Sequence, residues 1–200
     1  FAFDLAALII ERVTKQSYFE FLNQRFFTRL AMKDTIARPA RLADWQGVRT
    51  MGYKWAKDAW QVVDVFDMEA FLGASNLYFS AVDLAHWANA NAAGKAIPTE
   101  VFNAGQQRTL INGKPSSITG LSWYCDKTGT RCYYTGSINA FHGFVYWDTQ
   151  QDISAVFLSN SSLSPWNLIN LQLGLVDTLS GKTTQKENIP DFNILKKETY

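Results

Sequence analysis

Four β-rich runs that follow one another between residues 118 and 160 constrain the fold of this chain most strongly. Turn residues separate each run from the next, and the runs read ITGLSWYC, RCYYTGS, FHGFVYWD and ISAVFLSN. Aromatic and β-branched residues favour strands, and short connections join strands that run in opposite directions. The segment therefore predicts an antiparallel meander.

Helical patterns precede and follow this meander. FAFDLAALIIERV opens the chain with Asp4, Glu11 and Arg12 on one narrow stripe, which predicts a helix whose remaining surface is buried. Ser17 and Glu20 have the spacing of a capping box, so a second helix is expected through about residue 30. Further helices are expected at 80–92, after residue 98, and at 166–179.

This order of elements predicts an α+β (α/β) fold in which helices flank an antiparallel sheet. We expect a mostly helical subdomain at residues 1–117, and the sheet with its C-terminal helix at 118–181. Residues 182–200 are polar and are expected to form a surface tail. Because a domain seldom begins with an uncapped apolar helix, we also expect the helical subdomain to be incomplete at its N-terminus.

The overall charge points away from nucleic acid. Nineteen Lys and Arg against 18 Asp and Glu leave a net charge of +1, so no basic surface attracts phosphate. The most apolar run contains Asp4, Glu11 and Arg12 and is too short for a transmembrane segment. His86 and His142 lie far apart in the sequence, and no cluster has metal-ligand spacing. A small-molecule or peptide partner is expected, with no metal and no cofactor.

A Thr-Gly pair occurs twice within residues 126–137. Asp126 precedes the first copy, Lys127–Gly129, and an Asp followed three positions later by Gly is typical of a turn. This pattern predicts a hairpin tip between strands at 120–125 and 131–137. If Cys125 lies opposite Cys132, Trp123 falls opposite Tyr134 and the second copy, residues 134–136, lies inside a strand. Only the second copy can then present an extended backbone edge.

These two cysteines are the only ones in the sequence, and they flank the turn. A disulfide between Cys125 and Cys132 would imply an oxidising compartment. Two buried free thiols in a cytosolic protein are the alternative, and the sequence leaves both open.

Seven motifs in collinear order resemble the serine β-lactamase and penicillin-binding-protein family, in the branch of class C β-lactamases, DD-peptidases and related esterases. They are FAFDLAALIIERVTKQSYFEFL, LAMKDT (30–35), GYKW (52–55), SNLYFSAVDLAHW (75–87), GLSW (120–123), YTGSINAF (134–141) and VFLSNSS (156–162). The resemblance implies a β-lactamase/transpeptidase-like fold.

The family's third motif, Lys or His followed by Thr or Ser and then Gly, corresponds to Tyr134, Thr135 and Gly136. The resemblance implies that Thr135 and Gly136 bind substrate along the strand, that Tyr134 takes the catalytic position of the cation, and that the Ser137 N–H helps to hold an oxyanion. Tyr134 departs from the family because it carries no positive charge. Ala140 also departs, because the family has Gly at that position.

Two further family motifs, Ser-x-x-Lys and Tyr-x-Asn, are absent from the sequence. No serine is followed three positions later by lysine, and no tyrosine is followed two positions later by asparagine. The resemblance therefore implies the C-terminal half of a periplasmic or secreted serine hydrolase. Such an enzyme acts through an acyl-enzyme on an amide, ester, β-lactam or D-amino-acid peptide. The missing upstream segment would supply the nucleophile, and this chain alone would be inactive. The alternative is a non-catalytic scaffold for binding or assembly, which Tyr134 favours.

Overall fold

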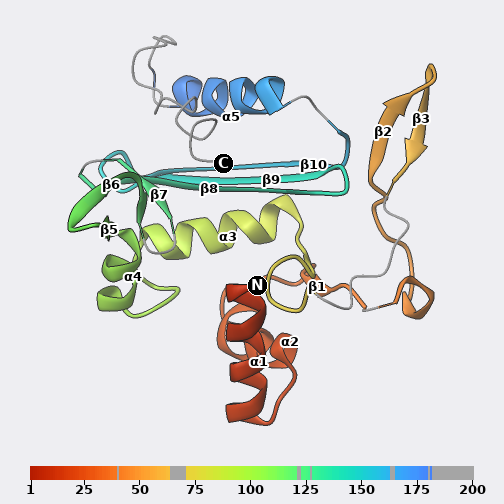
Figure 1. Ribbon diagram of the computed structural model, residues 1–200, viewed down its shortest axis with the longest axis horizontal. Coiled ribbons are helices and arrows are strands. Elements are labelled where there is room, and N and C mark those ends of the chain that lie inside the picture. The colour runs from red at the N-terminus through yellow and green to blue at the C-terminus, as the bar shows by residue number, and fades with distance from the viewer. Residues whose placement is uncertain are drawn as a thin grey trace.

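The computed structural model describes residues 1–39, 41–63, 71–120, 123–126, 128–162, 165–179 and 181. A four-stranded antiparallel sheet in the order β10-β9-β8-β7 forms its centre, with α5 on one face and α3 on the other (Figure 1). The strands are β7 (Tyr124–Cys125), β8 (Arg131–Ile138), β9 (Phe141–Asp148) and β10 (Ile153–Ser159). The predicted meander and the α+β fold class are confirmed.

The strand predicted over 120–125 is confirmed at Tyr124–Cys125 but not at Trp123, which lies in a bend, whereas residues 121 and 122 lie outside the described residues. β6 (Lys114–Gly120) pairs instead with β5 (Arg108–Ile111), and β7 is only two residues long. Asn112 and Gly113, at φ of 51° and 76°, form a tight turn that favours a local hairpin with β5. Residues 118–120 of the β-rich run thus belong to β6.

The helices form where the sequence predicts them, and those that follow Ser17 and Ser80 have a side-chain cap. Their bounds are α1 (Ala2–Thr14), α2 (Tyr18–Leu22), α3 (Ala81–Ala92), α4 (Thr99–Gln106) and α5 (Pro165–Leu179). Ser17 and Glu20 form the predicted capping box, and α2 continues as a π-helical turn at Asn23–Phe27. At α3 the Ser80 hydroxyl accepts a hydrogen bond of 3.1 Å from the Asp83 N–H.

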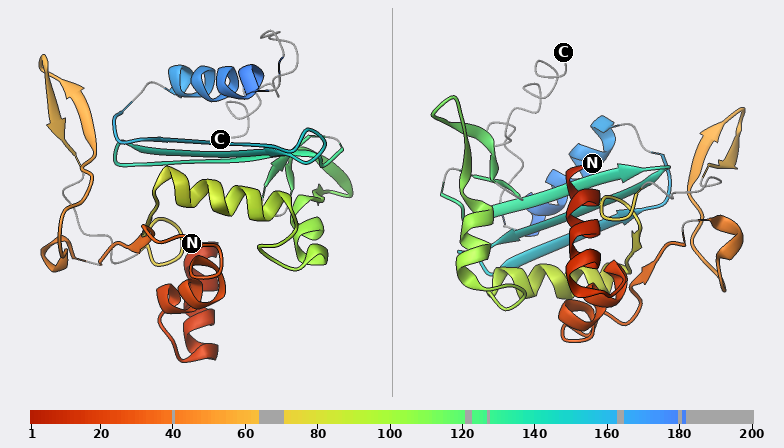
Figure 2. Two further views of the ribbon diagram at one scale, coloured as in Figure 1. Left: turned by 180° about the vertical axis from the view of Figure 1, so that it is seen from behind. Right: turned by 60° about the horizontal axis from the view of Figure 1, so that its bottom comes forward.

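Two further antiparallel pairs lie outside the main sheet. They are β1 (Ile36–Ala37) with β4 (Leu77–Tyr78), and β2 (Tyr53–Ala56) with β3 (Ala59–Val62). The β2–β3 hairpin projects from the body of the protein (Figure 2). Its base is tied to the end of β10, because the Tyr53 N–H donates to the Asn160 carbonyl at 2.8 Å.

The main sheet separates two apolar clusters. On the α3 face the buried members are Leu84, Ala88, Phe102, Cys125, Cys132, Val145 and Trp147. On the other face Phe144, Tyr146 and Ala155 pack against Leu175 and Val176 of α5. Alternate residues of β9 thus enter opposite cores, as a strand covered on both faces requires.

The first helix forms as predicted, but the prediction that most of its surface is buried is wrong. Ala7 is buried, whereas Phe3, Leu8 and Val13 are 58%, 54% and 75% exposed. The helix packs on α2, and Asp4 Oδ1 accepts hydrogen bonds from the Gly73 and Ala74 N–H groups at 2.9 and 3.1 Å. These contacts hold one side of α1 and leave its other apolar side chains uncovered.

Lys127 and the predicted tail at 182–200 lie outside the described residues. The division into subdomains at residues 117 and 118 stays a prediction. None of the helices in the described ranges combines the length and hydropathy needed to cross a bilayer.

Candidate functional site

The second Thr-Gly copy lies in β8, on a partly open edge of the sheet. On one side β8 pairs with β9 along its whole length, with Tyr134 opposite Val145 and Gly136 opposite Gly143. On the other side the described pairs with β7 end at Tyr133. From Tyr134 onward, no strand within the described residues pairs on this side.

A cavity of about 490 Å³ lies beside this edge. Its lining residues come mainly from β4, β8, β9, the end of β10 and the start of α3, and include Leu77, Tyr78, Phe79, Leu84, Ile138, Phe141, Val145, Leu158 and Asn160. Tyr134, Gly136 and Ser137 line it as well, whereas Thr135 does not. Three of the four site residues expected from the sequence therefore border one concave, largely apolar space.

Gly136 leaves room at the wall of this cavity. A Cβ atom built on Gly136 meets nothing within 4 Å, and one built on its cross-strand partner Gly143 would only touch Leu158 Cδ2 at 3.6 Å. A larger side chain at Gly136 would enter space that a ligand could occupy.

Tyr134 contributes a neutral phenol. Its ring packs edge-on against Trp123 at 6.0 Å between centroids and stacks with Tyr124 at 6.1 Å. Burial raises the pKa of the Tyr134 hydroxyl, and the neighbouring Tyr124 raises it further. The phenol stays protonated at neutral pH, so it can donate a hydrogen bond but is poorly suited to act as a base.

The neighbouring polar residues are arranged across the strands. The Thr135 hydroxyl donates to the Gly143 carbonyl at 3.2 Å, which directs its hydrogen to β9. Ser137 lies opposite His142 in the register, and both border the cavity. Burial lowers the pKa of His142, so its imidazole is neutral at pH 7.

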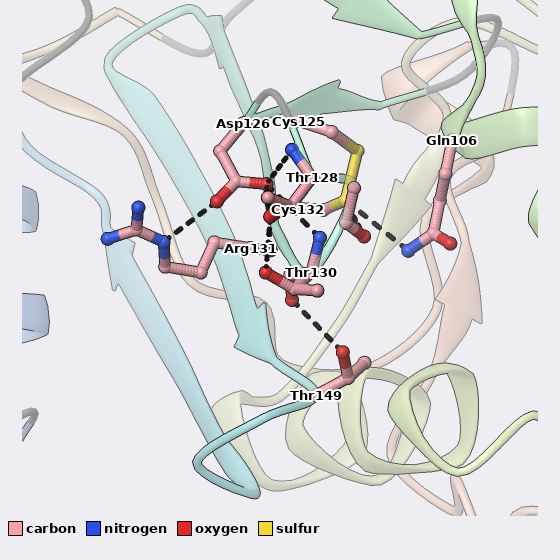
Figure 3. Close-up of a disulfide and its surroundings, with 9 residues drawn as sticks. Gln106, Cys125, Asp126, Thr128, Thr130, Arg131, Cys132 and Thr149 are labelled. Atoms are coloured by element: carbon pink, nitrogen blue, oxygen red, sulfur yellow. Dashed lines mark hydrogen bonds and ion pairs between the residues drawn. A yellow bond between two sulfur atoms is a disulfide. The ribbon is translucent and has the colours of Figure 1, made fainter.

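The first Thr-Gly copy forms a turn away from the cavity. The Asp126 carboxylate accepts hydrogen bonds from the N–H groups of Thr128 and Thr130 at 3.2 and 3.1 Å, and forms an ion pair of 3.0 Å with Arg131 (Figure 3). Gly129 has a φ of +73°, which other residues adopt with strain. Thr128 and Gly129 thus lie at the hairpin tip, as the sequence predicts.

A disulfide joins Cys125 of β7 to Cys132 of β8 (Figure 3). The two cysteines are 6% and 0% exposed and lie opposite each other in the register. The bond holds the short strand β7 beside β8, together with the aromatic residues that contact Tyr134.

Arg38 and Tyr78 also line the cavity, and the sequence pattern did not indicate them. The Arg38 guanidinium donates a 3.0 Å hydrogen bond from Nη1 to the Tyr78 hydroxyl, and Arg38 is only 5% exposed. Among the described lining residues, Arg38 alone carries a full charge at neutral pH. Position 38 follows the LAMKDT motif closely, but no periodicity marks it as inward-facing.

A buried carboxylate connects two of the sequence motifs. Asp83, which is 2% exposed, accepts hydrogen bonds from the Asp34 N–H at 2.8 Å and the Thr35 hydroxyl at 2.7 Å. LAMKDT is thereby fixed to the first turn of α3, beside the cavity. Among the described side chains, no three His, Cys, Asp or Glu residues are grouped closely enough to hold a metal ion.

A sequence model of the beta-lactamase family matches residues 1–173. A search of curated protein sequences gives no match. Similar folds occur in FmtA from Staphylococcus aureus (TM-score 0.66, 19% identity, covering 85% of this chain and 46% of that chain) and in a penicillin binding protein from Bacillus halodurans (0.68, 14%, 86% and 54%). Another is a beta-lactamase/D-alanine carboxypeptidase from Pseudomonas syringae (0.67, 20%, 88% and 57%). The chain spans about half the length of these structures.

Proposed function

The chain belongs to the beta-lactamase family, and from that premise we propose that it forms the C-terminal part of a serine hydrolase. An upstream segment that carries Ser-x-x-Lys and Tyr-x-Asn would complete the active site. Such a segment is compatible with the length of the similar structures, of which this chain covers about half.

The observation that carries this proposal is the cavity beside β8, which Tyr134, Gly136 and Ser137 line. The upstream serine adds to a substrate carbonyl, and the Ser137 N–H stabilises the oxyanion of the tetrahedral intermediate. The leaving group departs with a proton, which leaves an acyl-enzyme that water hydrolyses. Tyr134 donates a hydrogen bond to the substrate, because its raised pKa keeps the phenol protonated.

The substrate class follows from the same premise. We propose an amide, ester, β-lactam or D-amino-acid peptide, in keeping with similar structures that include a D-amino acid amidase from Ochrobactrum anthropi SV3. The disulfide supports a periplasmic or secreted location, because such bonds persist in oxidising compartments.

A non-catalytic scaffold for binding or assembly is the second candidate. Tyr134 favours it, since a phenol replaces the cation that the resemblance leads one to expect at this position. The two candidates differ in whether a nucleophilic serine accompanies the cavity.

Active-site labelling distinguishes them. Residues 1–200 and a longer protein that includes the natural upstream segment are treated with a fluorophosphonate and with a fluorescent penicillin. We expect labelling of the longer protein at its Ser-x-x-Lys serine, none after that serine is changed to Ala, and none of residues 1–200 alone. Labelling of a serine within residues 1–200 would contradict the proposal. A longer protein that is folded but unlabelled and hydrolyses no ester would favour the scaffold.

A further inference from the structure

The two ends of the cavity differ in charge. The register of β8 and β9 orders its wall, with Tyr134 and Val145 toward one end and Ile138 and Phe141 toward the other. Four residues of strand separate these ends by about 13 Å. Ser137 lies next to the second end.

Arg38 belongs to the Phe141 end. Its Nη1 atom donates to the Tyr78 hydroxyl at 3.0 Å, and the Tyr78 ring packs edge-on against Phe141 with 5.4 Å between centroids. The Arg38 N–H also donates to the Asn76 carbonyl at 2.7 Å, which fixes the backbone that carries the guanidinium. The positive charge is therefore held in place at the cavity wall, next to the Tyr78 ring.

The chemistry of this arrangement favours an anion. A guanidinium pairs with a carboxylate through parallel hydrogen bonds, and such bonds are stronger in a site that is shielded from water. The side chain already holds Tyr78, but a guanidinium presents five N–H donors and can bind a carboxylate in addition to its protein neighbours. At the other end, Tyr134 offers a neutral donor.

We infer that Arg38 is a specificity-determining residue that binds a carboxylate of the substrate on the Phe141 side of the reacting carbonyl, with Tyr78 and Phe141 contacting the adjacent apolar part. The inference rests on the proposed function for the identity of the reacting carbonyl. The charge that is absent at Tyr134 is then supplied from the opposite end of the same cavity.

Equilibrium binding tests this inference without any turnover. The longer protein with its Ser-x-x-Lys serine changed to Ala is titrated with 4-phenylbutyrate and with the neutral 4-phenylbutyramide in a calorimeter. We expect the carboxylate to bind about tenfold more tightly than the amide, as a charge-assisted hydrogen bond allows. Equal affinities would overturn the inference, and this comparison requires no change at Arg38.

Substitutions then locate the effect. Arg38→Gln should remove the preference for the carboxylate, and Arg38→Lys should retain part of it. The matched control Arg41→Gln removes the same charge from an exposed side chain that pairs with Asp44, and it should leave the preference intact. The same loss in Arg41→Gln, or an unchanged preference in folded Arg38→Gln, would overturn the assignment.

Hydrolysis by the intact longer protein separates this inference from the proposed function. Three esters are compared. The first is a p-nitrophenyl ester with a carboxylate on its acyl chain, the second is a hydroxybenzoate ester with the carboxylate on its leaving group, and the third is a p-nitrophenyl ester with no carboxylate. Arg38→Gln should lower kcat/KM about tenfold for the anionic ester whose carboxylate lies on the Phe141 side of the reacting carbonyl. For the neutral ester it should lower kcat/KM less than about twofold. An equal loss for all three would mean that Arg38 only supports the fold. If the longer protein hydrolyses none of the three esters and is labelled by neither the fluorophosphonate nor the penicillin, but still binds the carboxylate, the proposed function is contradicted and the carboxylate site stands.

Discussion

Two stretches of this chain carry the same Thr-Gly pair, and the fold uses them in opposite ways. Thr128–Gly129 lies in a turn, where Gly129 at a φ of +73° permits a backbone conformation that other residues adopt with strain. Thr135–Gly136 lies in β8, where Gly136 leaves open space at the cavity wall. The same dipeptide supplies conformational freedom in one place and room for a ligand in the other.

The largest expected effect separates the two glycines. Gly136→Leu should lower kcat/KM of the longer protein by about 100-fold or more, because its side chain enters the cavity. Gly129→Ala should instead destabilise the protein by about 1 kcal/mol through its left-handed backbone and leave kcat/KM unchanged. Ester hydrolysis and urea unfolding of both variants measure this. An active Gly136→Leu variant would mean that the strand copy does not border the site.

The disulfide joins β7 to β8 on either side of the turn, and its removal is expected to have the next largest effect. Replacing Cys125 and Cys132 together by Ser should destabilise the protein by about 2 kcal/mol, as expected for a short closed loop. The KM should also rise, because β7 carries Tyr124 against the Tyr134 ring. Unfolding is measured with and without reductant. Reductant should lower the free energy of unfolding of the parent protein only. An equal decrease in the double variant would show that the disulfide is not the source of this stability.

A smaller gain in stability is expected at the other end of β8. Asn139 and Ala140 join β8 to β9 with φ of 50° and 69°, a tight turn in which Ala140 is strained. Ala140→Gly should stabilise the protein by about 0.5 to 1 kcal/mol, because the relieved strain exceeds the added flexibility of the unfolded chain. Ala85→Gly within α3 is the control and should destabilise by about 1 kcal/mol. If thermal unfolding showed both variants to be less stable than the parent protein, the interpretation that Ala140 is strained in this turn would be contradicted.

The smallest expected effect is the dependence of the turn on pH. Burial raises the pKa of Asp126, but hydrogen bonds from Thr128 and Arg131 outweigh it and hold the pKa below its ordinary value of 3.8. The folded state therefore favours the carboxylate, and this stabilisation is present above pH 3.8 and is lost as the pH falls through the lowered pKa. Asp126→Asn should weaken the protein by less than about 1 kcal/mol at pH 7, since the group is partly exposed. The difference between variant and parent in urea unfolding should vanish in acid, and a difference that persisted there would exclude the carboxylate charge as its cause.

Features that depend on neighbours in the sequence could be predicted. The capping box of Ser17 and Glu20, the start of α3 at Ser80 and the turn at Asp126 form through contacts within a few residues. The strands β8, β9 and β10 likewise follow from their composition and from the short turns between them. Motif order predicted Tyr134, Gly136 and Ser137 as site residues, and all three line one cavity, although their roles stay a prediction.

Features that depend on distant parts of the chain were decided only by the tertiary structure. Periodicity showed that α1 is apolar, but burial requires a partner, and α2 covers only part of it. The run at 118–125 has strand composition throughout, yet its described residues pair with two different partners, β6 with β5 and β7 with β8. Arg38 reaches the cavity because β1 pairs with β4 and brings it to Tyr78, forty positions later in the chain. Local preferences thus determined which elements form, whereas long-range packing decided which surfaces they bury and which charge lies at the site, because those depend on partners that no local pattern specifies.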